Sequence, residues 1–308
     1  MSQNYTETDS RTNGTESDTT VSTNNHSQRP LVGEELKLTY PSSDQPIIDG
    51  ESIAAEPGAV TALVGPNGSG KSTLLKGLAN QLTPEAGTVV LDGHEIQTLK
   101  TKEIARKLGL LSQESTSPNS ITVEDLVYHG RYPHRGFFDS VTDEDEAAVE
   151  RAIELSGCGH LREREVGSLS GGQKQLAWIA MVLAQDTDVL LLDEPTTFLD
   201  LHHQLEVMEI IETLRDQSDI TIMVVLHDIQ QAARLADRMV ALKDGEIQAR
   251  GSPEEIVTEA LLADVFEIEA VVEQTSRGPR IDPLRARHDG DTDRDGESTG
   301  RPDGVEAE

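Results

Sequence analysis

The sequence has little cysteine and no long apolar run, and each shortage excludes a class of protein. The single cysteine, Cys158, excludes an intramolecular disulfide framework and a cysteine-based zinc site, and it fits a reducing compartment. The apolar runs at 189–192 and 220–226 are far shorter than the roughly 20 residues that span a bilayer. The first twenty residues lack both a basic and an apolar segment, so we expect no secretory signal. The chain is therefore not expected to cross a membrane by itself.

Positive charge is also scarce. The chain has 26 Lys and Arg against 56 Asp and Glu, a formal net charge of -30. Most of this charge lies between the polar termini, so the folded surface would repel phosphate backbones, and we expect no nucleic-acid partner. Because molar salt screens charges within about 3 Å, the same surface suggests a halophilic, salt-adapted protein.

Composition divides the chain into a body and two tails. Residues 1–30 and most of 276–308 are rich in small polar and acidic residues, which predicts disordered tails. In the body, residues 31–275, strands alternate with helices. The predicted strands are 36–40, 60–64, 88–91, 189–192 and 221–226, and a helix is predicted over 71–80.

Two stretches of the body depart from this alternation. Residues from about 115 to 185 contain no convincing strand, and the run DEDEAAVERAIEL has acids in its first turn and apolar residues at helical spacing, which predicts a helical insertion. The segment RMVALKDGEIQARG predicts a β-hairpin that turns at Asp244 and Gly245.

The run GPNGSGKS, residues 65–72, fits the phosphate-loop pattern G-x-x-x-x-G-K-[S/T] between a predicted strand and a predicted helix. Glycines let successive backbone N–H groups face one anion, and Lys71 adds a full charge for the β and γ phosphates. Ser72 can place its hydroxyl on Mg²⁺. The predicted nucleotide-binding residues are Gly65, Asn67, Gly68, Ser69, Gly70, Lys71, Ser72 and Thr73.

Polar residues follow three apolar runs of the body. Asp193 and Glu194 follow the run VLLL, at the end of a predicted strand where ligands of open α/β sheets bind. Asp193 is therefore predicted to hold magnesium and Glu194 to act on an attacking water. The alternative is that these acids cap the next helix. His227 ends another run and can donate a hydrogen bond to a γ-phosphate, and Gln113 can reach the magnesium or the water.

A second glycine pair, Gly171 and Gly172, lies in LSGGQ (169–173) at the start of an apolar-striped helix. With GPNGSGKST, Gln113, LLLDEP, Asp200 and His227 in the family's order, the chain resembles the ATP-binding subunits of ABC transporters over about residues 33–270. The resemblance implies an α/β fold: a P-loop NTPase core with a mostly parallel sheet, an antiparallel β subdomain and a helical ABC-specific subdomain.

The resemblance also implies how two glycine-rich motifs serve one reaction. In this family two subunits form a homodimer head to tail, and LSGGQ of one closes over the ATP of the other. Asp200 would lie across that interface, and Tyr40 would stack on adenine. The residues of the second motif that would bind ATP are Ser170, Gly171, Gly172 and Gln173.

Two further segments of the sequence resemble one subgroup of this family. TVEDLVYHGRYPHRG and EPTTFLDLHHQLEVMEII look like ATPases of iron(III)-siderophore importers, with hemin and cobalamin importers as near relatives. This implies a polytopic membrane permease on whose cytoplasmic side the homodimer sits, and, indirectly, an extracellular substrate-binding protein. The alternatives are a soluble ABC ATPase of iron–sulfur cluster assembly and a binding module without turnover; Glu194 and His227 argue against the latter.

Overall fold

The computed structural model describes residues 30–113, 120–136 and 139–287 of the 308-residue chain. Its centre is a six-stranded sheet in which β6 (Leu108–Leu111), β7 (Val189–Asp193), β8 (Thr221–Val225), β3 (Val60–Val64) and β9 (Arg238–Lys243) run parallel. At one edge β10 (Glu246–Gly251) pairs antiparallel with β9. The predicted strands at 60–64, 189–192 and 221–226 and the predicted hairpin are confirmed, and β3, β7 and β8 are buried at every position.

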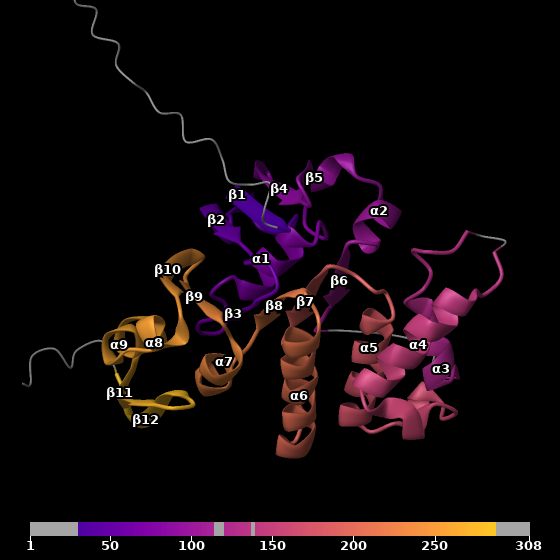
Figure 1. The fold of residues 1–308 in the computed structure, drawn as a ribbon. Helices are drawn as coiled ribbons and strands as arrows, with labels where there is room; N and C mark the ends of the chain where they lie inside the picture. Colours follow the sequence, from indigo (N-terminus) through magenta and orange to yellow (C-terminus); the bar gives the residue numbers. More distant parts are fainter. Residues whose placement is uncertain (1–29, 114–119, 137–138, 288–308) are drawn as a thin grey trace, which may run out of the picture.

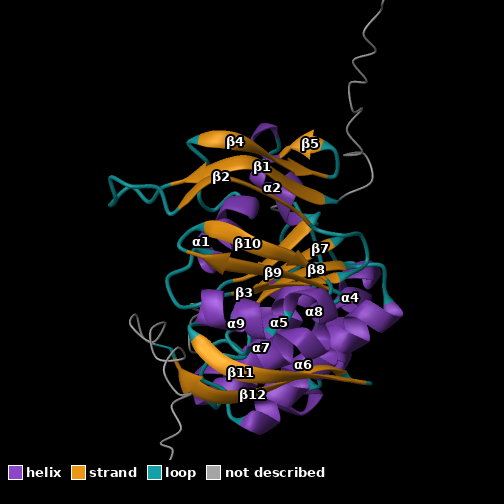
Figure 2. Ribbon diagram, turned by 90° about the vertical axis from the view of Figure 1, so that its left-hand side faces the viewer, coloured by secondary structure: helices purple, strands orange, loops and turns teal. Residues whose placement is uncertain are grey.

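A second, antiparallel sheet covers one face of the centre. Its order is β2 (Ile48–Ala54), β1 (Leu31–Leu38), β4 (Ala86–Leu91) and β5 (His94–Glu95). Helix α1 (Lys71–Leu78) lies between the two sheets, as Figure 2 shows, and its leucines pack in one core with residues of both. The first strand ends two residues before the predicted end at 40, and β2 was not predicted because IDGESIA has only two buried positions.

The segment predicted to be a helical subdomain contains α3 (Val123–His129), α4 (Asp143–Leu155) and α5 (Gly171–Leu183), which lie together beside the centre (Figure 1). Thr122 and Thr142 start α3 and α4 by accepting a hydrogen bond from the backbone N–H three residues on. Cys158 is buried under these helices, accepts a hydrogen bond of 3.0 Å from Ser156 Oγ, and has its thiol pKa raised by burial.

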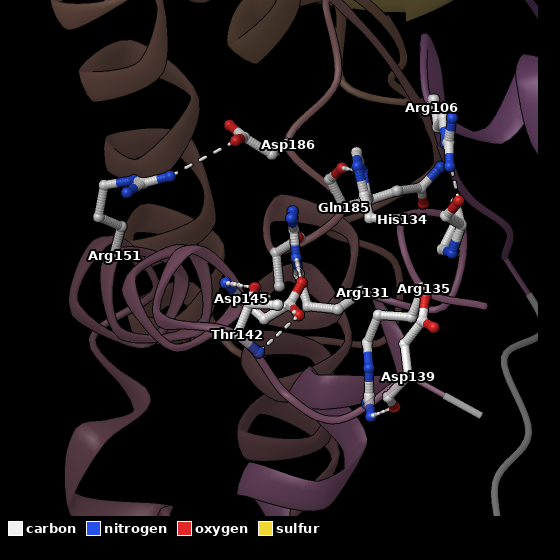
Figure 3. Close-up of polar contacts among 12 residues, drawn as sticks. Arg106, Arg131, His134, Arg135, Asp139, Thr142, Asp145, Arg151, Gln185 and Asp186 are labelled. Atoms are coloured by element: carbon white, nitrogen blue, oxygen red, sulfur yellow. Dashed lines mark hydrogen bonds and ion pairs between the residues drawn. The ribbon is translucent and has the colours of Figure 1, made fainter. Parts of the chain in front are cut away.

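A buried ion pair holds the far end of α5. Arg131 is 1% exposed; its Nε donates to Asp145 Oδ1 at 2.9 Å and its Nη1 to the carbonyl of Ala184, directly after α5, at 3.0 Å (Figure 3). Burial raises the pKa of Asp145, but hydrogen bonds from Arg131 and Thr142 outweigh it and lower the pKa below its ordinary value. Both charges of this buried pair thus have hydrogen-bond partners within the protein.

Further polar contacts tie the helices to the central sheet. The ring Nε2 of His134 donates to the carbonyl of Gln185 at 2.7 Å, and the Gln185 amide donates to the carbonyl of Leu108 at 2.9 Å. Arg106, after α2 (Thr101–Ala105), donates to the carbonyl of Pro133 at 2.8 Å. Figure 3 shows His134, Gln185 and Arg106 grouped at this junction, so the carboxyl end of α5 is fixed on the centre.

The opposite face carries α6 (Leu201–Gln217), α7 (Ile229–Leu235), α8 (Pro253–Ile256) and α9 (Glu259–Phe266). The chain then forms a hairpin of β11 (Ile268–Thr275) and β12 (Gly278–Ala286) against these helices (Figure 2). The structure therefore differs from the predicted tail at 276–308. The reason is that β12 is held by a residue far away in the sequence: the Gln230 amide donates to Pro279 O and accepts from Ile281 N, both at 2.8 Å.

The rest of that predicted tail, residues 288–308, and residues 1–29 lie outside the described residues. Within the described part of the chain, no helix combines the length and the apolar character that a membrane span needs. The predicted fold class, an α/β P-loop core with an antiparallel subdomain and a helical subdomain, is confirmed.

Candidate active site

The phosphate loop connects β3 to α1, and two of its glycines are sterically required. Gly65 has φ 147°, and a Cβ there would lie 2.0 Å from the carbonyl oxygen of Leu242. Gly70 has φ 97°, and its Cβ would lie 2.7 Å from Ile48 Cδ1. Because L side chains rarely adopt such angles, only glycine lets the loop turn tightly before the helix begins.

Lys71 supplies the positive charge of this loop from a buried position. It is 4% exposed, and its Nζ donates to the carbonyls of Gly65 and Pro66 at 2.9 and 2.8 Å. Burial lowers the pKa of Lys71, while the nearby carboxylates of Glu194 and Asp193 act in the opposite direction. An ammonium held among carbonyls at a helix start is placed to bind phosphate oxygens.

Ser72 and Asp193 form a pair of hard oxygen ligands. The Ser72 hydroxyl donates to Asp193 Oδ1 at 2.7 Å, and Asp193 is 2% exposed. Burial raises the pKa of Asp193, and the hydrogen bond from Ser72 only partly offsets this effect. A carboxylate kept in such surroundings fits a divalent cation such as Mg²⁺, which prefers oxygen ligands and would restore the lost charge stabilisation.

Three side chains converge on one oxygen of Glu194. Its Oε2 lies 2.8 Å from Gln113 Nε2, 2.6 Å from His227 Nε2 and 3.2 Å from Thr197 Oγ1. Glu194 has φ 52°, an unfavourable conformation for a residue with a Cβ, which costs about 1–3 kcal/mol. The fold therefore holds this carboxylate in place with three contacts and a strained backbone.

Two adjoining cavities open at this group of residues. One, of about 750 Å³, is bounded by the loop, Glu194 and His227, and the other, of about 180 Å³, by Lys71, Ser72 and Thr73; Asn67, Gly68 and Glu194 line both. Their size suits a small-molecule ligand. A larger cavity of about 830 Å³ lies between α4, α5 and the end of α6. No residue of the phosphate loop lines this larger cavity. The candidate active site is therefore the pair of smaller cavities, which the phosphate loop and Glu194 line.

The structure brings most of the predicted residues together here. Asp193 and Glu194 do not cap the next helix, because the residue that caps α6 is Asp200. Tyr40 follows β1, and its hydroxyl lies 3.5 Å from Thr73 Oγ1, so it is close to the phosphate-loop helix. Whether Tyr40 stacks on a base stays a prediction.

The residues of the second glycine motif lie elsewhere. Ser170 begins α5, accepts from Gln173 N at 3.3 Å and donates its own N–H to Gln173 Oε1 at 3.2 Å. Ser170 and Gly171 are exposed, and neither they nor Asp200 line the two cavities. Hydrogen bonds from the backbone and ring of His203 lower the pKa of Asp200. Within one chain, these residues are therefore outside the phosphate site.

Sequence reasoning missed several residues of the site. Thr197 could have been found, because it follows Glu194 by three residues in DEPTT. Phe198, 95% exposed, and Phe266, at the end of α9, line the larger of the two cavities. Phe266 could not be predicted from the sequence, because it lies at the end of α9, far along the chain from the motifs of the site.

Comparison with known proteins adds an independent finding. The ABC transporter family model matches residues 48–197. The ferric enterobactin transport ATP-binding protein FepC of Escherichia coli K12 is 44% identical over 256 residues, covering 82% of this chain and 94% of that protein. The petrobactin import ATP-binding protein FpuD of Bacillus anthracis is 44% identical over 245 residues, covering 80% and 89%. A solved inward-facing ABC transporter described as metal-chelate type has a TM-score of 0.71 and 27% identity over 84% of this chain and 98% of its own.

Proposed function

This chain belongs to the ATP-binding subunits of the ABC transporter family, and we propose that its ATP hydrolysis drives the import of iron(III)-siderophore complexes. The observation that carries the ATPase part is the convergence of Gln113 and His227 on Glu194 beside the phosphate loop. The cargo rests on the ferric enterobactin and petrobactin relatives. A hemin or cobalamin importer is the alternative.

The proposed reaction uses groups already in place. Backbone N–H groups of the loop and Lys71 would bind the β and γ phosphates. Ser72 and Asp193 would hold Mg²⁺, which would supply positive charge to stabilise the charge that develops on the phosphates. A water oxygen bonds to the γ-phosphorus while the bond to the bridging oxygen breaks and ADP leaves. Glu194 accepts the proton of that water, Gln113 orients it, and His227 donates a hydrogen bond to the γ-phosphate.

The exposed start of α5 supports a homodimer in this proposal. Ser170, Gly171, Gly172 and Gln173 lie at the start of a 13-residue helix and outside their own chain's cavities. The N–H groups of Ser170 and Gln173 are used in the capping box, so those of Gly171 and Gly172 are the ones available to another anion. In a head-to-tail pair they would close over the partner's ATP, with Asp200 near the interface. Hydrolysis would remove the bridging phosphate and let the pair open.

The proposed partners follow from the family. A polytopic permease would hold two copies of this chain on the cytoplasmic side of the membrane, and an extracellular substrate-binding protein would deliver cargo without touching the chain. Nucleic acid is not a proposed partner, because the net charge is -30.

Glu194→Gln tests the catalytic role. We expect kcat for ATP hydrolysis to fall about 10²- to 10⁴-fold, because the amide cannot take the proton, while ATP affinity is retained. The matched control is Glu209→Gln, an exposed acid on α6, which should leave kcat unchanged. Normal turnover of the Glu194→Gln protein would remove Glu194 from its role.

Purification from membranes tests the transporter role. The tagged chain should be recovered from detergent-solubilised membranes with a polytopic protein in a two-to-two complex. Recovery only from the soluble fraction, with soluble partners, would replace the transporter by an iron–sulfur assembly ATPase and leave the ATP chemistry intact. Transport assays with ferric siderophores, hemin and cobalamin then identify the cargo.

We also propose salt adaptation from the surplus of acids. The free energy of unfolding should be larger in molar KCl than in dilute buffer, because salt screens the repulsion among surface carboxylates. Denaturation curves at both concentrations measure this, and equal stability would contradict it.

A further inference from the structure

The two glycines of LSGGQ differ in what surrounds them. A Cβ at Gly171 would have no atom within 4 Å, whereas a Cβ at Gly172 would lie 2.2 Å from Cγ and Cδ2 of His203. Gly172 has no positive φ, so its need for glycine is a need for space and not for an unusual backbone angle. The ring of His203 occupies the volume that a side chain at position 172 would fill.

The same ring also contacts Asp200. His203 Nδ1 lies 2.8 Å from Asp200 Oδ1, and the backbone N–H of His203 donates to that oxygen at 3.0 Å. The His203 side chain is 20% exposed, so it is mostly enclosed between α5 and the start of α6. The His203 side chain therefore contacts both Gly172 and Asp200, two residues that lie outside the phosphate site of their own chain.

The first turn of α6 is anchored on its other side as well. The Gln204 amide donates to Leu199 O at 3.1 Å, and the Gln231 amide donates to Gln204 Oε1 at 2.9 Å. Gln231 is on α7, the helix that begins two residues after His227. The turn that carries His203 is thus linked to the segment before it and to the helix that follows the γ-phosphate histidine.

We propose that His203 is a positioning residue that fixes Gly172 and Asp200 of one chain at a constant spacing, so that both engage the nucleotide of the partner subunit together. This inference rests on the proposed homodimer. His203 touches no nucleotide of its own chain; it acts through the glycine it packs against and the carboxylate it binds.

The neighbouring histidine provides a matched control. His202 is 78% exposed; its ring lies 3.6 Å from Glu206 and contacts the His203 ring edge-on with centroids 5.4 Å apart, so both of these contacts are within α6. His203→Ala and His202→Ala remove the same atoms one residue apart. His203→Asn keeps a donor close to the position of Nδ1 and should restore part of the contact with Asp200.

The main test measures ATP-driven dimerisation by light scattering in the slowly hydrolysing Glu194→Gln protein, together with the ATP affinity of the monomer. His203→Ala should weaken dimerisation about 5- to 150-fold at unchanged monomer ATP affinity, with His202→Ala neutral and His203→Asn intermediate. If the Glu194→Gln parent does not dimerise, the proposed function fails. If it dimerises and His203→Ala dimerises equally well, this inference alone is overturned.

A second test separates packing from ligand contact. Gly172→Ala should lower the unfolding temperature because its Cβ meets the His203 ring, and the same change in a His203→Ala background should lower it much less. If the two substitutions lower the unfolding temperature by strictly additive amounts, the His203 ring is not the reason that position 172 needs a glycine. That result would overturn the inference.

Discussion

The helix starts of α1 and α5 both carry glycines and both resemble anion sites, yet they are built differently. The start of α1 has a buried lysine, three glycines with positive φ and the carboxylates of Asp193 and Glu194 close by. The start of α5 has no positive-φ glycine, and its N-cap is satisfied by its own Gln173. The first combines its buried lysine with two adjoining cavities of the same chain, whereas the second has no buried lysine and lines neither of those cavities.

The difference fits the proposed homodimer, in which the start of α5 would serve the nucleotide of the partner subunit. Because the start of α5 already has its capping hydrogen bonds, it does not lower the stability of the folded chain when no ligand is bound. The loop at α1, by contrast, contains a buried ammonium and a buried carboxylate whose burial opposes their charges. Four substitutions sharpen this comparison.

Arg131→Met should have the largest effect, because Arg131 fixes the carboxyl end of α5 and its loss leaves Asp145 buried without its partner. We expect a loss of about 3–5 kcal/mol in the free energy of unfolding, measured with denaturant. Replacing both residues, as Arg131→Met with Asp145→Leu, should cost less. A full-sized loss in the double variant would show that the pair is not what anchors α5.

Lys71→Gln should have the next largest effect, at the helix start proposed to bind ATP without the partner subunit. Loss of a charged contact of about 3 kcal/mol raises the ATP Kd roughly 100-fold, measured by calorimetry on the monomer. The control is Lys174→Gln in the first turn of α5, which should leave that Kd unchanged. Equal losses in both variants would break the distinction between the two helix starts.

Ser170→Ala removes the cap of α5 and should cost about 1 kcal/mol of stability. Thr142→Ala removes the comparable cap of α4 and should cost more, because the Thr142 hydroxyl also donates to the buried carboxylate of Asp145 at 2.9 Å. Neither should change ATP affinity of the monomer, but only Ser170→Ala should weaken dimerisation with ATP. A changed monomer affinity after Ser170→Ala would place this residue in its own chain's site.

Asp193→Asn should have the smallest effect, a modest gain in stability without ligand. Because burial raises the pKa of Asp193, the folded state binds the proton more tightly than the unfolded state does. The wild type therefore loses stability as pH rises from the ordinary carboxyl pKa to the raised one, and asparagine does not. Thermal unfolding between pH 3 and pH 8 should show this gap opening, and Mg²⁺-dependent hydrolysis should be lost.

The sequence predicted the parts of the fold and site that depend on residues close together in the chain. The strands β3, β7 and β8 are continuous apolar runs, and the loop at 65–72 is a contiguous motif, so both could be identified from the sequence. The pairing of Gly172 with His203 could not, because it joins residues of two helices and leaves no periodic signal. Strand β12 was missed for the same reason, since its polar sequence is ordered by Gln230.

The single cysteine has a practical consequence for following the dimer. Cys158 is fully buried and its raised thiol pKa disfavours the reactive thiolate, so thiol reagents should leave it unmodified in the folded protein. A cysteine introduced at an exposed position outside the site, such as Glu209 on α6, would then be the sole labelled site on each copy. Spin-label distances between two such copies would report opening and closing in the wild-type background, without first removing a native thiol.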